Sequence, residues 1–383
     1  MLPRRVLVLG LARSGKAAAA ALTRRGVEVA AADRELGNDG DVSLLDGIEV
    51  LVKSPGVPRE AALVAEAERR GIPVWSEVEL GYRLFRPRLL GVTGTNGKTT
   101  TCELLGVILQ APVAGNVGRA LTELDGQVQP GAWVVCELSS FQLEDVHELA
   151  CEIAVLLNLE PDHLDRHGTF EAYRDAKLRI FERARTKIVP RGLGLDGIEF
   201  AVDDPLPAEP LMRGDHNREN AVAAAAAARA AGIPDERIAE ALRTFPGVPH
   251  RLELVSELNG VRYVNDSKAT NVAAALRALA AYEDEPVHLI VGGSRKGEDF
   301  TPLAAALGRN VKSVHAVGET AGELAAAIPQ AQKDGDLAHA LAAIDADPGD
   351  VVLLSPACAS YDQFRDFEER GEEFRRLVQN LSA

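Results

Sequence analysis

The stretch best suited to chemistry is LLGVTGTNGKTTTCELLG, residues 89–106. An apolar run breaks at Gly94–Gly97, and a helix-forming segment follows from Lys98. Glycines let a backbone approach phosphate closely, and N–H groups at a helix start point toward it. Lys98 supplies a positive charge for the β- and γ-phosphates, and the Thr99 hydroxyl can ligate Mg²⁺. Val92 replaces the first glycine of the strict phosphate-loop pattern, but the order of strand, loop and helix favours an ATP site over a surface turn with a solvated lysine.

Acidic and histidine side chains follow the next predicted strands. Glu137 comes directly after the apolar run 133–136, which is the usual place for a second support of Mg²⁺. The strand 153–157 opens into a loop rich in metal-capable groups, which are Asn158, Glu160, Asp162, His163, Asp165 and His167. Mg²⁺ prefers oxygen, so a histidine there would be a minority ligand beside carboxylates. Lys177 lies in a helix predicted over 170–184, and composition alone predicts that it is a solvated lysine.

A second glycine loop lies near the N-terminus. The strand 6–9, the loop GLARSGK (10–16) and a helix to Arg25 lead into a strand over 27–32 that ends at Asp33. This is half of a dinucleotide-binding unit, with an acid placed for a ribose or a base. Ala12 occupies the second glycine position, and Ala17 offers no hydroxyl for magnesium. We therefore expect this loop to hold the diphosphate of a nucleotide-bearing substrate, although a glycine fingerprint alone is equally compatible with a purely structural turn.

Composition narrows the class of protein. The chain has 383 residues, which predicts two or three domains, and its 46% hydrophobic and 26% charged content is typical of a soluble globular protein. The net charge of −15 argues against nucleic acid as the main partner. Four scattered cysteines form no C-x-x-C pair, which fits a reducing cytoplasm. The N-terminal apolar run is short and continues as strand and turn, so we expect neither an export signal nor a membrane span.

The alternation of elements predicts an α/β fold. Further strands are expected over 48–52, 261–264, 288–291, 314–317 and 351–354. Strands separated by helix-length segments indicate doubly wound parallel sheets. Arg86–Arg88 and Pro246–Pro249 read as linkers. We therefore predict three domains, over residues 1–87, 88–247 and 248–383.

Seven segments carry a resemblance over nearly the whole chain. They are GTNGKTT, ELSSFQLE, EPDHLDRHGTFEAYRDAKLRIF, GDHNRENAVAA, PHRLELV, NDSKATN and LSPACASYDQF. Together they resemble the Mur ligases of peptidoglycan precursor synthesis, and NDSKATN and SPACAS resemble the branch that adds D-glutamate. The resemblance implies an N-terminal Rossmann-like domain for a UDP-linked substrate, a central P-loop ATPase domain and a C-terminal Rossmann-like amino-acid domain. It also implies an acyl-phosphate intermediate formed from UDP-N-acetylmuramoyl-L-alanine and ATP, which D-glutamate then attacks, in a cytoplasmic monomer.

The resemblance implies roles for individual residues. Lys98, His163 and Lys177 would be catalytic. The ATP side would comprise Gly94, Thr95, Asn96, Gly97, Lys98, Thr99, Thr100, Asn217, Asn220, Arg251 and Asp266. Two Mg²⁺ ions would be held by Thr99, Glu137, His163 and Lys177, the last carbamylated, which replaces the reading of Lys177 as a solvated lysine. The UDP substrate would meet Leu11, Ala12, Arg13, Asp33, Ser54, Gly56, Asn116 and Gln142. D-glutamate would meet Lys268, Thr270, Lys296, Ser360 and Phe367.

Two departures and two alternatives stand beside this prediction. Ala12 and Arg13 differ from the family's common residues, and the stretch between Phe181 and Gly214 is short for the family, so edge strands of the central sheet are expected to be missing.

The first alternative is a sister ligase with another amino acid, or a folate-type ligase; the D-N-P-R motif of the diamino-acid branch is absent from the sequence. The second is a nucleotide-binding regulator that ligates nothing, which would not need the combination of Glu137, His163 and Lys177.

Overall fold

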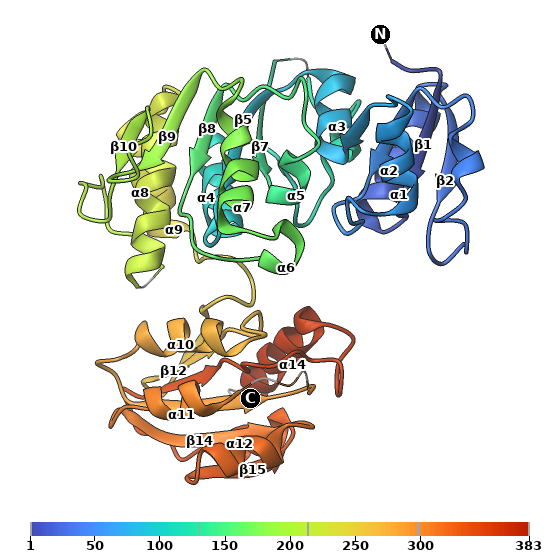
Figure 1. Ribbon diagram of the computed structural model, residues 1–383. Coiled ribbons are helices and arrows are strands. Elements are labelled where there is room, and N and C mark those ends of the chain that lie inside the picture. The colour runs from blue at the N-terminus through green and yellow to red at the C-terminus, as the bar shows by residue number, and fades with distance from the viewer. Residues whose placement is uncertain (1, 130, 213, 296, 298, 382–383) are drawn as a thin grey trace. The chain divides into compact units, whose positions relative to one another are not determined.

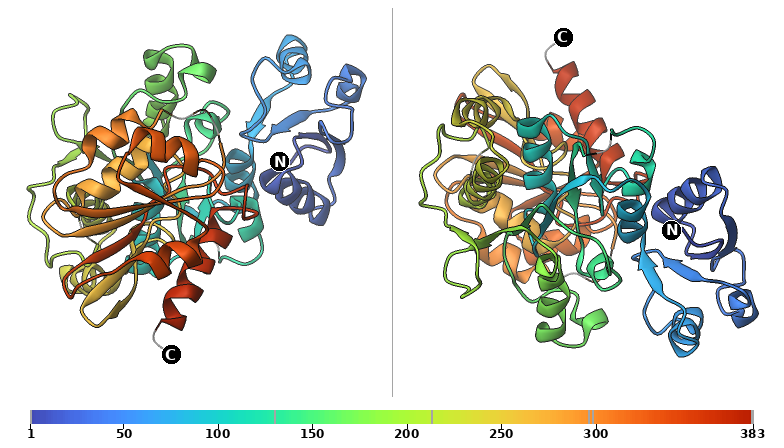
Figure 2. Two further views of the ribbon diagram at one scale, coloured as in Figure 1. Left: turned by 90° about the horizontal axis from the view of Figure 1, so that it is seen from below. Right: turned by 90° about the horizontal axis from the view of Figure 1, so that it is seen from above.

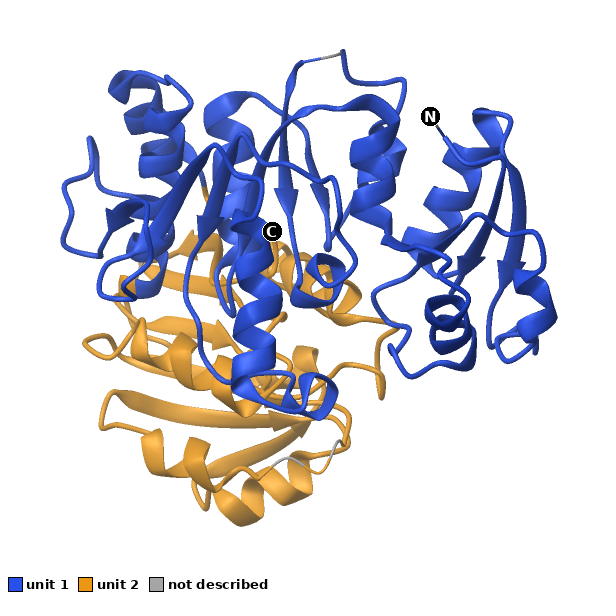
Figure 3. Ribbon diagram, turned by 45° about the horizontal axis from the view of Figure 1, so that its top comes forward, with its two compact units in different colours: residues 1–210, 216–245 blue, residues 211–215, 246–383 orange. Residues whose placement is uncertain are grey.

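The computed structural model describes residues 2–129, 131–212, 214–295, 297 and 299–381 (Figure 1). The chain divides into two compact units (Figure 3). Unit 1 contains residues 1–210 and 216–245, and unit 2 contains residues 211–215 and 246–383. Unit 1 holds the two N-terminal sheets and unit 2 holds the third. Helices flank the sheets on both faces (Figure 2), so the α/β fold class predicted from the alternation of elements is confirmed.

The first sheet of unit 1 is parallel, in the order β2-β1-β3-β4. Its strands are β1 (Arg5–Leu9), β2 (Glu28–Ala32), β3 (Val50–Lys53) and β4 (Val74–Ser76). The helical segments around it are α1 (Arg13–Arg24), η1 (Val42–Leu45), α2 (Ala62–Arg69) and α3 (Glu77–Phe85). Successive side chains of a strand face opposite sides of the sheet. Val6 and Val8 accordingly join the core with α1 and α3, whereas Leu7 and Leu9 join the core with α2.

The second sheet of unit 1 is also parallel, in the order β10-β9-β8-β5-β7-β6. Its strands are β5 (Arg88–Thr93), β6 (Val113–Gly115), β7 (Trp133–Glu137), β8 (Ile153–Leu156), β9 (Thr186–Pro190) and β10 (Ile198–Phe200). Its helices are α4 (Lys98–Leu109), α5 (Ser140–Leu143), α6 (Leu164–His167), α7 (Phe170–Leu178), α8 (Asp215–Ala230) and α9 (Asp235–Thr244), with 3₁₀ turns η2 (Leu121–Leu124) and η3 (Arg179–Phe181). The helix predicted over 170–184 is shorter than expected, because its last turns tighten into η3 before the chain enters β9. The short stretch after Phe181 still forms two strands, β9 next to β8 and β10 at the edge of the sheet.

The sheet of unit 2 has the order β11-β12-β16-β13-β14-β15. Its strands are β11 (Glu253–Leu258), β12 (Val261–Asn265), β13 (Val287–Gly292), β14 (Val311–Val317), β15 (Ala331–Gly335) and β16 (Val351–Leu354). Its helices are α10 (Val272–Ala280), α11 (Thr301–Ala306), α12 (Ala321–Ala327), α13 (Leu337–Ala343) and α14 (Phe367–Asn380). All pairs are parallel except β11 with β12, an antiparallel edge that the sequence patterns do not predict. Helices α10–α12 pack on one face and α13 and α14 on the other.

Glu77 at the start of α3 is a buried acid that links the two sheets of unit 1. Its carboxylate accepts a 2.6 Å hydrogen bond from the Thr122 N–H of η2. Burial raises the pKa of Glu77 from 4.5 to about 6. The folded state thus favours the protonated acid. The associated stability is complete below about pH 4.5 and is lost as the pH rises through about 6.

We expect Glu77→Gln to stabilise unit 1 at alkaline pH, because glutamine stays neutral. The pKa difference corresponds to about 2 kcal/mol in the free energy of unfolding at pH 8, and to almost none at pH 4.5. Both tryptophans, Trp75 and Trp133, lie in unit 1, so urea unfolding followed by tryptophan fluorescence reports on this unit. A variant that is destabilised at pH 8, or changed equally at both pH values, would contradict the assignment.

Candidate functional site

The glycine loop of the central sheet runs from the end of β5 to the start of α4. Gly97 has φ of +82°, and a Cβ added there would collide with Oδ1 of Asn220, a buried residue of α8. The first N–H groups of an α-helix have no partner within the helix, so those of α4 are available to an anion at its start. Lys98 and Thr99 stand in this first turn. The loop therefore has the geometry of a phosphate site. Position 97 requires glycine because Asn220 fills the space that a Cβ would occupy.

The outer part of this loop is held by the segment that follows β8. The Thr95 N–H donates to the Asn158 carbonyl oxygen over 3.2 Å, and the Asn96 N–H donates to Asn158 Oδ1 over 2.8 Å. The Thr95 hydroxyl lies 2.9 Å from the Tyr173 hydroxyl. Because Asn158 accepts the hydrogen bonds of the Thr95 and Asn96 N–H groups, the N–H groups that remain for a phosphate in this conformation are those in the first turn of α4.

Two lysines converge on one carbonyl group of the loop. Lys98 Nζ donates to the Gly94 and Thr95 oxygens over 2.8 and 2.9 Å, and Lys177 Nζ donates to the same Gly94 oxygen over 2.7 Å. Lys177 is 2% exposed, so its composition-level reading as a solvated lysine is wrong. Burial, followed by the charge of Lys98, lowers the pKa of Lys177 to about 7. A large share of Lys177 is therefore a neutral amine at neutral pH.

The predicted metal ligands lie around the same edge of the sheet. Glu137 is buried at the end of β7, beside Val92 of β5, and accepts a 3.0 Å hydrogen bond from Asn116 Nδ2. The His163 side chain is 51% exposed, 3.5 Å from Asp162. Within the part of the chain that the structure describes, no three His, Cys, Asp or Glu side chains form a preformed metal cluster.

These residues nevertheless fit Mg²⁺ in a nucleotide site. Mg²⁺ usually takes one or two carboxylates and completes its shell with phosphate oxygens and water, so a closed protein cage is not required. Glu137 offers one buried carboxylate beside the loop. The Thr100 hydroxyl, also in the first turn of α4, is buried and has no hydrogen-bond partner among the described residues, which is a further polar atom that a bound group could satisfy.

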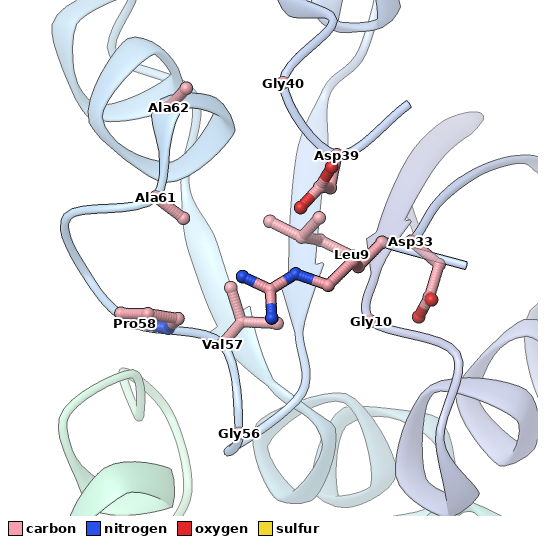
Figure 4. A pocket seen from close by; sticks show the side chains of 11 residues that line it. Leu9, Gly10, Asp33, Asp39, Gly40, Gly56, Val57, Pro58, Ala61 and Ala62 are labelled. Carbon is pink, nitrogen blue, oxygen red and sulfur yellow. The ribbon is translucent and has the colours of Figure 1, made fainter. Parts of the chain in front are cut away.

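A cavity of about 540 Å³ lies at the carboxyl edge of the first sheet (Figure 4). Asp33 and Gly56, both predicted to meet the UDP substrate, line it together with Asp39 (Figure 4). Backbone hydrogen bonds from Leu11 and Glu35 hold the Asp33 carboxylate and lower its pKa. The other lining residues are Leu9, Gly10, Arg34, Gly40, Val57, Pro58, Ala61 and Ala62.

Other residues predicted to meet the UDP substrate lie outside the cavity lining. Ser54 is buried and donates a 2.7 Å hydrogen bond to the Gly10 oxygen, so it supports the loop from behind. Arg13 donates to the Gly118 oxygen in the loop after β6, which holds its guanidinium away from the cavity. Gln142 is buried, and its Oε1 closes a capping box with Ser139 at the start of α5. Of the residues predicted to contact the UDP substrate, Asp33 and Gly56 therefore line the cavity.

Unit 2 gathers most of the predicted D-glutamate residues at one sheet edge. Asn265 pairs with Leu354 at the ends of β12 and β16, so the NDSKATN and SPACAS loops are neighbours. Lys268 Nζ lies 5.8 Å from the centre of the Phe367 ring. The remaining members, Thr270 and Ser360, belong to the same two loops, whereas Lys296 falls outside the described residues.

The predicted adenosine residues are divided between the units. Asn217 and Asn220 are buried in α8 of unit 1, whereas Arg251 and Asp266 belong to unit 2. Asp266 accepts hydrogen bonds from Ser355 Oγ (2.8 Å) and the Leu252 N–H (3.2 Å). Burial raises the pKa of Asp266 to about 7, so protonated and ionised forms coexist at neutral pH.

Arg370 of α14 is a site residue that the sequence patterns do not reveal. Its buried guanidinium donates to Ser267 Oγ and to the Ser267, Cys358 and Ala359 carbonyl oxygens, at 2.8–3.1 Å. Burial lowers the pKa of Arg370 to about 10. It joins the two D-glutamate loops, but in the sequence it is one arginine in the helix FEERGEEFRR, which resembles an ordinary charged surface.

Gly97→Ala is expected to weaken ATP binding at least tenfold, because the new Cβ collides with Asn220 at the phosphate cradle. Gly126→Ala is the matched control: its φ of +80° gives similar backbone strain, but its Cβ would meet nothing within 4 Å. Binding of a fluorescent ATP analogue compares the two. Equal losses of affinity in both variants would mean that backbone strain, and not the contact with Asn220, causes the effect.

Comparison with known proteins agrees with this geometry. The Mur ligase middle domain matches residues 92–191, and the Mur ligase glutamate ligase domain matches residues 250–358. A protein of Anaeromyxobacter dehalogenans named UDP-N-acetylmuramoylalanine–D-glutamate ligase is 41% identical, with 98% of this chain and 97% of the relative covered. A relative of the same name from Geobacillus kaustophilus is 39% identical, with 99% and 98% covered.

Solved structures show the same fold at lower identity. The UDP-N-acetylmuramate–alanine ligase of Thermotoga maritima superposes with a TM-score of 0.65 at 18% identity, covering 98% of this chain and 99% of that one. The MurF ligase of Thermotoga maritima in complex with ADP gives a TM-score of 0.61 at 18% identity, covering 89% and 91%. Taken with the relatives that match over almost their full length, these findings place the sequence: the chain belongs to the Mur ligase family.

Proposed function

We propose that this chain is an ATP-dependent ligase that joins D-glutamate to UDP-N-acetylmuramoyl-L-alanine and releases ADP and phosphate. The observation that carries the proposal is the 41% identity, over 98% of the chain, to a relative named for this reaction. The phosphate cradle at α4 and the adjoining NDSKATN and SPACAS loops in unit 2 support it.

The reaction has two bond-forming steps. The γ-phosphoryl group passes from ATP to a carboxylate oxygen of the UDP substrate, which forms an acyl phosphate and ADP. The amine of D-glutamate attacks the acyl carbon, phosphate leaves, and the nitrogen loses a proton to give the amide. Phosphoryl transfer depends on positioning and on neutralising charge at the phosphate oxygens. Lys98 and the N–H groups at the start of α4 serve both purposes.

We assign the metal ligands as follows. Thr99 and Glu137 would hold one Mg²⁺ with the phosphates, and His163 and a carbamylated Lys177 would hold a second. Bound Mg²⁺ supplies positive charge that neutralises the phosphate oxygens. The lowered pKa of Lys177 supports its carbamylation, because a neutral amine adds to CO₂ and then loses a proton. The Lys177 amine beside Lys98 would thereby become an anion.

The remaining sites follow the same proposal. ATP meets the loop from Gly94 to Thr100, with the adenosine at Asn217, Asn220, Arg251 and Asp266. The uridine part of the substrate enters the cavity at Asp33 and Gly56, and its distal part lies toward Asn116 and Gln142. D-glutamate binds at Lys268, Thr270, Lys296, Ser360 and Phe367.

We further propose three domains over 1–87, 88–247 and 248–383, in a cytoplasmic monomer without a nucleic-acid partner. Among the described residues, no helix has the length and apolarity needed to span a membrane.

A direct test follows labelled D-glutamate into product. The chain is incubated with UDP-N-acetylmuramoyl-L-alanine, ATP, Mg²⁺ and radioactive D-glutamate, and the nucleotide-linked product and ADP are quantified together. Equal amounts of labelled product and ADP are expected. ADP without labelled product would favour a nucleotide-hydrolysing regulator, and no product of either kind would contradict the ligase assignment.

A further inference from the structure

His167 at the end of α6 joins Ser140 and Glu144 in a chain of polar contacts. Its side chain is 2% exposed, although the surrounding loop is largely exposed. Nε2 lies 2.9 Å from Ser140 Oγ, and Nδ1 lies 3.1 Å from Glu144 Oε1. Ser140 and Glu144 belong to the segment that follows β7, at α5 and its C-terminal end. The chain therefore joins the loop after β8 to the loop after β7.

Both nitrogens of the His167 ring have a polar neighbour. Burial, with the charges of His163, Arg166 and Lys177, lowers the pKa of His167. A neutral imidazole donates through one nitrogen and accepts through the other. Nε2 shares a hydrogen bond with the Ser140 hydroxyl, and Nδ1 faces the Glu144 carboxylate at 3.1 Å.

The order serine, histidine, glutamate also occurs in nucleophilic catalysis, where a base activates a hydroxyl. Ser140 is 2% exposed, so its hydroxyl has almost no surface that a substrate carbonyl could reach. The chain is therefore suited to fixing the positions of its members.

Ring contacts extend the chain to a third segment. The His167 ring is stacked on Phe141, with centroids 5.0 Å apart and an interplanar angle of 3°, and meets Tyr173 of α7 edge-on at 5.4 Å. The Tyr173 ring in turn lies 4.7 Å from Lys177 Nζ. His167 thus touches the loop after β7 and helix α7 while standing in the loop after β8.

These three segments carry Glu137, His163 and Lys177, the proposed metal ligands outside the phosphate loop. Glu137 ends β7, three residues before Ser140, and His163 caps the start of the helix that His167 ends. Lys177 lies one turn after Tyr173. We propose that His167 is a positioning residue that fixes the spacing of these segments, and through it the affinity of the metal site. This inference rests on the metal ligands assigned in the proposed function.

The test measures metal binding without turnover. Mn²⁺ is titrated by electron paramagnetic resonance into the full chain with a non-hydrolysable ATP analogue. His167→Phe keeps a ring against Phe141 and Tyr173 but removes the hydrogen bond to Ser140 and the polar contact with Glu144. We expect it to weaken Mn²⁺ binding about 10- to 100-fold, as loss of a group that orients metal ligands does. His339→Phe, at a histidine whose side chain is 76% exposed in unit 2, is the control and should bind as the wild type does.

Ser140→Ala separates the Ser140–His167 hydrogen bond from general packing. It removes one small group of the same chain, so it should weaken Mn²⁺ binding by a smaller factor, and adding it to His167→Phe should cause little further loss. The proposal would be overturned if Ser140→Ala or a folded His167→Phe bound Mn²⁺ as tightly as the wild type does. It would also be overturned if the losses of affinity in the double variant were fully multiplicative, or if the wild type bound no Mn²⁺. If His167→Phe does not fold, Ser140→Ala decides alone. A wild type that binds Mn²⁺ but forms no D-glutamate product would contradict the proposed function, while the two variants would still decide the role of His167.

Discussion

Lys177→Ala is expected to lower the rate of D-glutamate-dependent ADP formation at least 100-fold. Removing one preorganised group that stabilises transition-state charge typically costs a factor of about 100 to 1,000. The variant loses the group whose carbamate would hold the second Mg²⁺, and of the two lysines that donate to the Gly94 oxygen it keeps Lys98. Initial rates at saturating ATP measure the effect. Lys187→Ala, a partly exposed lysine of β9, is the control and should keep the wild-type rate.

Small carboxylates should partly rescue this variant. Acetate or bicarbonate can supply the anion that carbamylated Lys177 would provide, so added acetate should raise the rate of Lys177→Ala and leave the wild type unchanged. Because the pKa of Lys177 is about 7, the neutral amine prevails above that pH and the ammonium below it. In CO₂-free buffer the wild type should therefore lose activity, and added bicarbonate should restore it more readily above pH 7 than below it. An uninhibited Lys177→Ala, or an inhibited variant that acetate does not help, would argue against a carbamate.

Lys98→Met should lower the rate of ATP-dependent product formation by a similar factor, about 100 to 1,000. Methionine keeps much of the apolar stem but loses the charge that Lys98 brings to the start of α4. Lys16→Met in the N-terminal glycine loop is the matched variant, because GLARSGK fits the spacing of a phosphate loop and Lys16 is exposed. We expect Lys16→Met to raise the KM for the UDP substrate at most, with the KM for ATP unchanged.

The comparison of the two lysines decides which loop serves ATP. If Lys16→Met raised the KM for ATP and Lys98→Met did not, the assignments of the two glycine loops would be reversed. Steady-state kinetics with each substrate varied in turn distinguishes these results.

The parts of the site that sequence predicts are those built from local segments. The loop from Gly94 follows β5, and Glu137 is the last residue of β7. Parallel strands bring their carboxyl ends to one edge of the sheet, so the pattern alone predicts that these residues are neighbours. The same reasoning places NDSKATN beside SPACAS in unit 2. The antiparallel strand β11 was not predicted, because its partly exposed residues lack the continuous apolar run of a buried parallel strand.

The parts that sequence does not predict depend on contacts between distant residues. Arg370 reaches Ser267 from a helix more than a hundred residues later, and nothing in its local pattern marks it as buried. The burial of Lys177 is of the same kind, since α7 alone reads as a half-exposed helix. Arg13 could not be placed either, because its guanidinium is held by Gly118 after β6. Side-chain direction is set by such long-range packing, which a single sequence does not specify.

The most direct test of the central claim is phosphate release from ATP with UDP-N-acetylmuramoyl-L-alanine present. D-glutamate, L-glutamate, L-lysine and meso-diaminopimelate are added in turn. We predict release with D-glutamate alone. Release with another amino acid and not with D-glutamate would keep the ligase chemistry but contradict the substrate assigned to the loops of unit 2, and release that no amino acid stimulates would contradict the ligase itself.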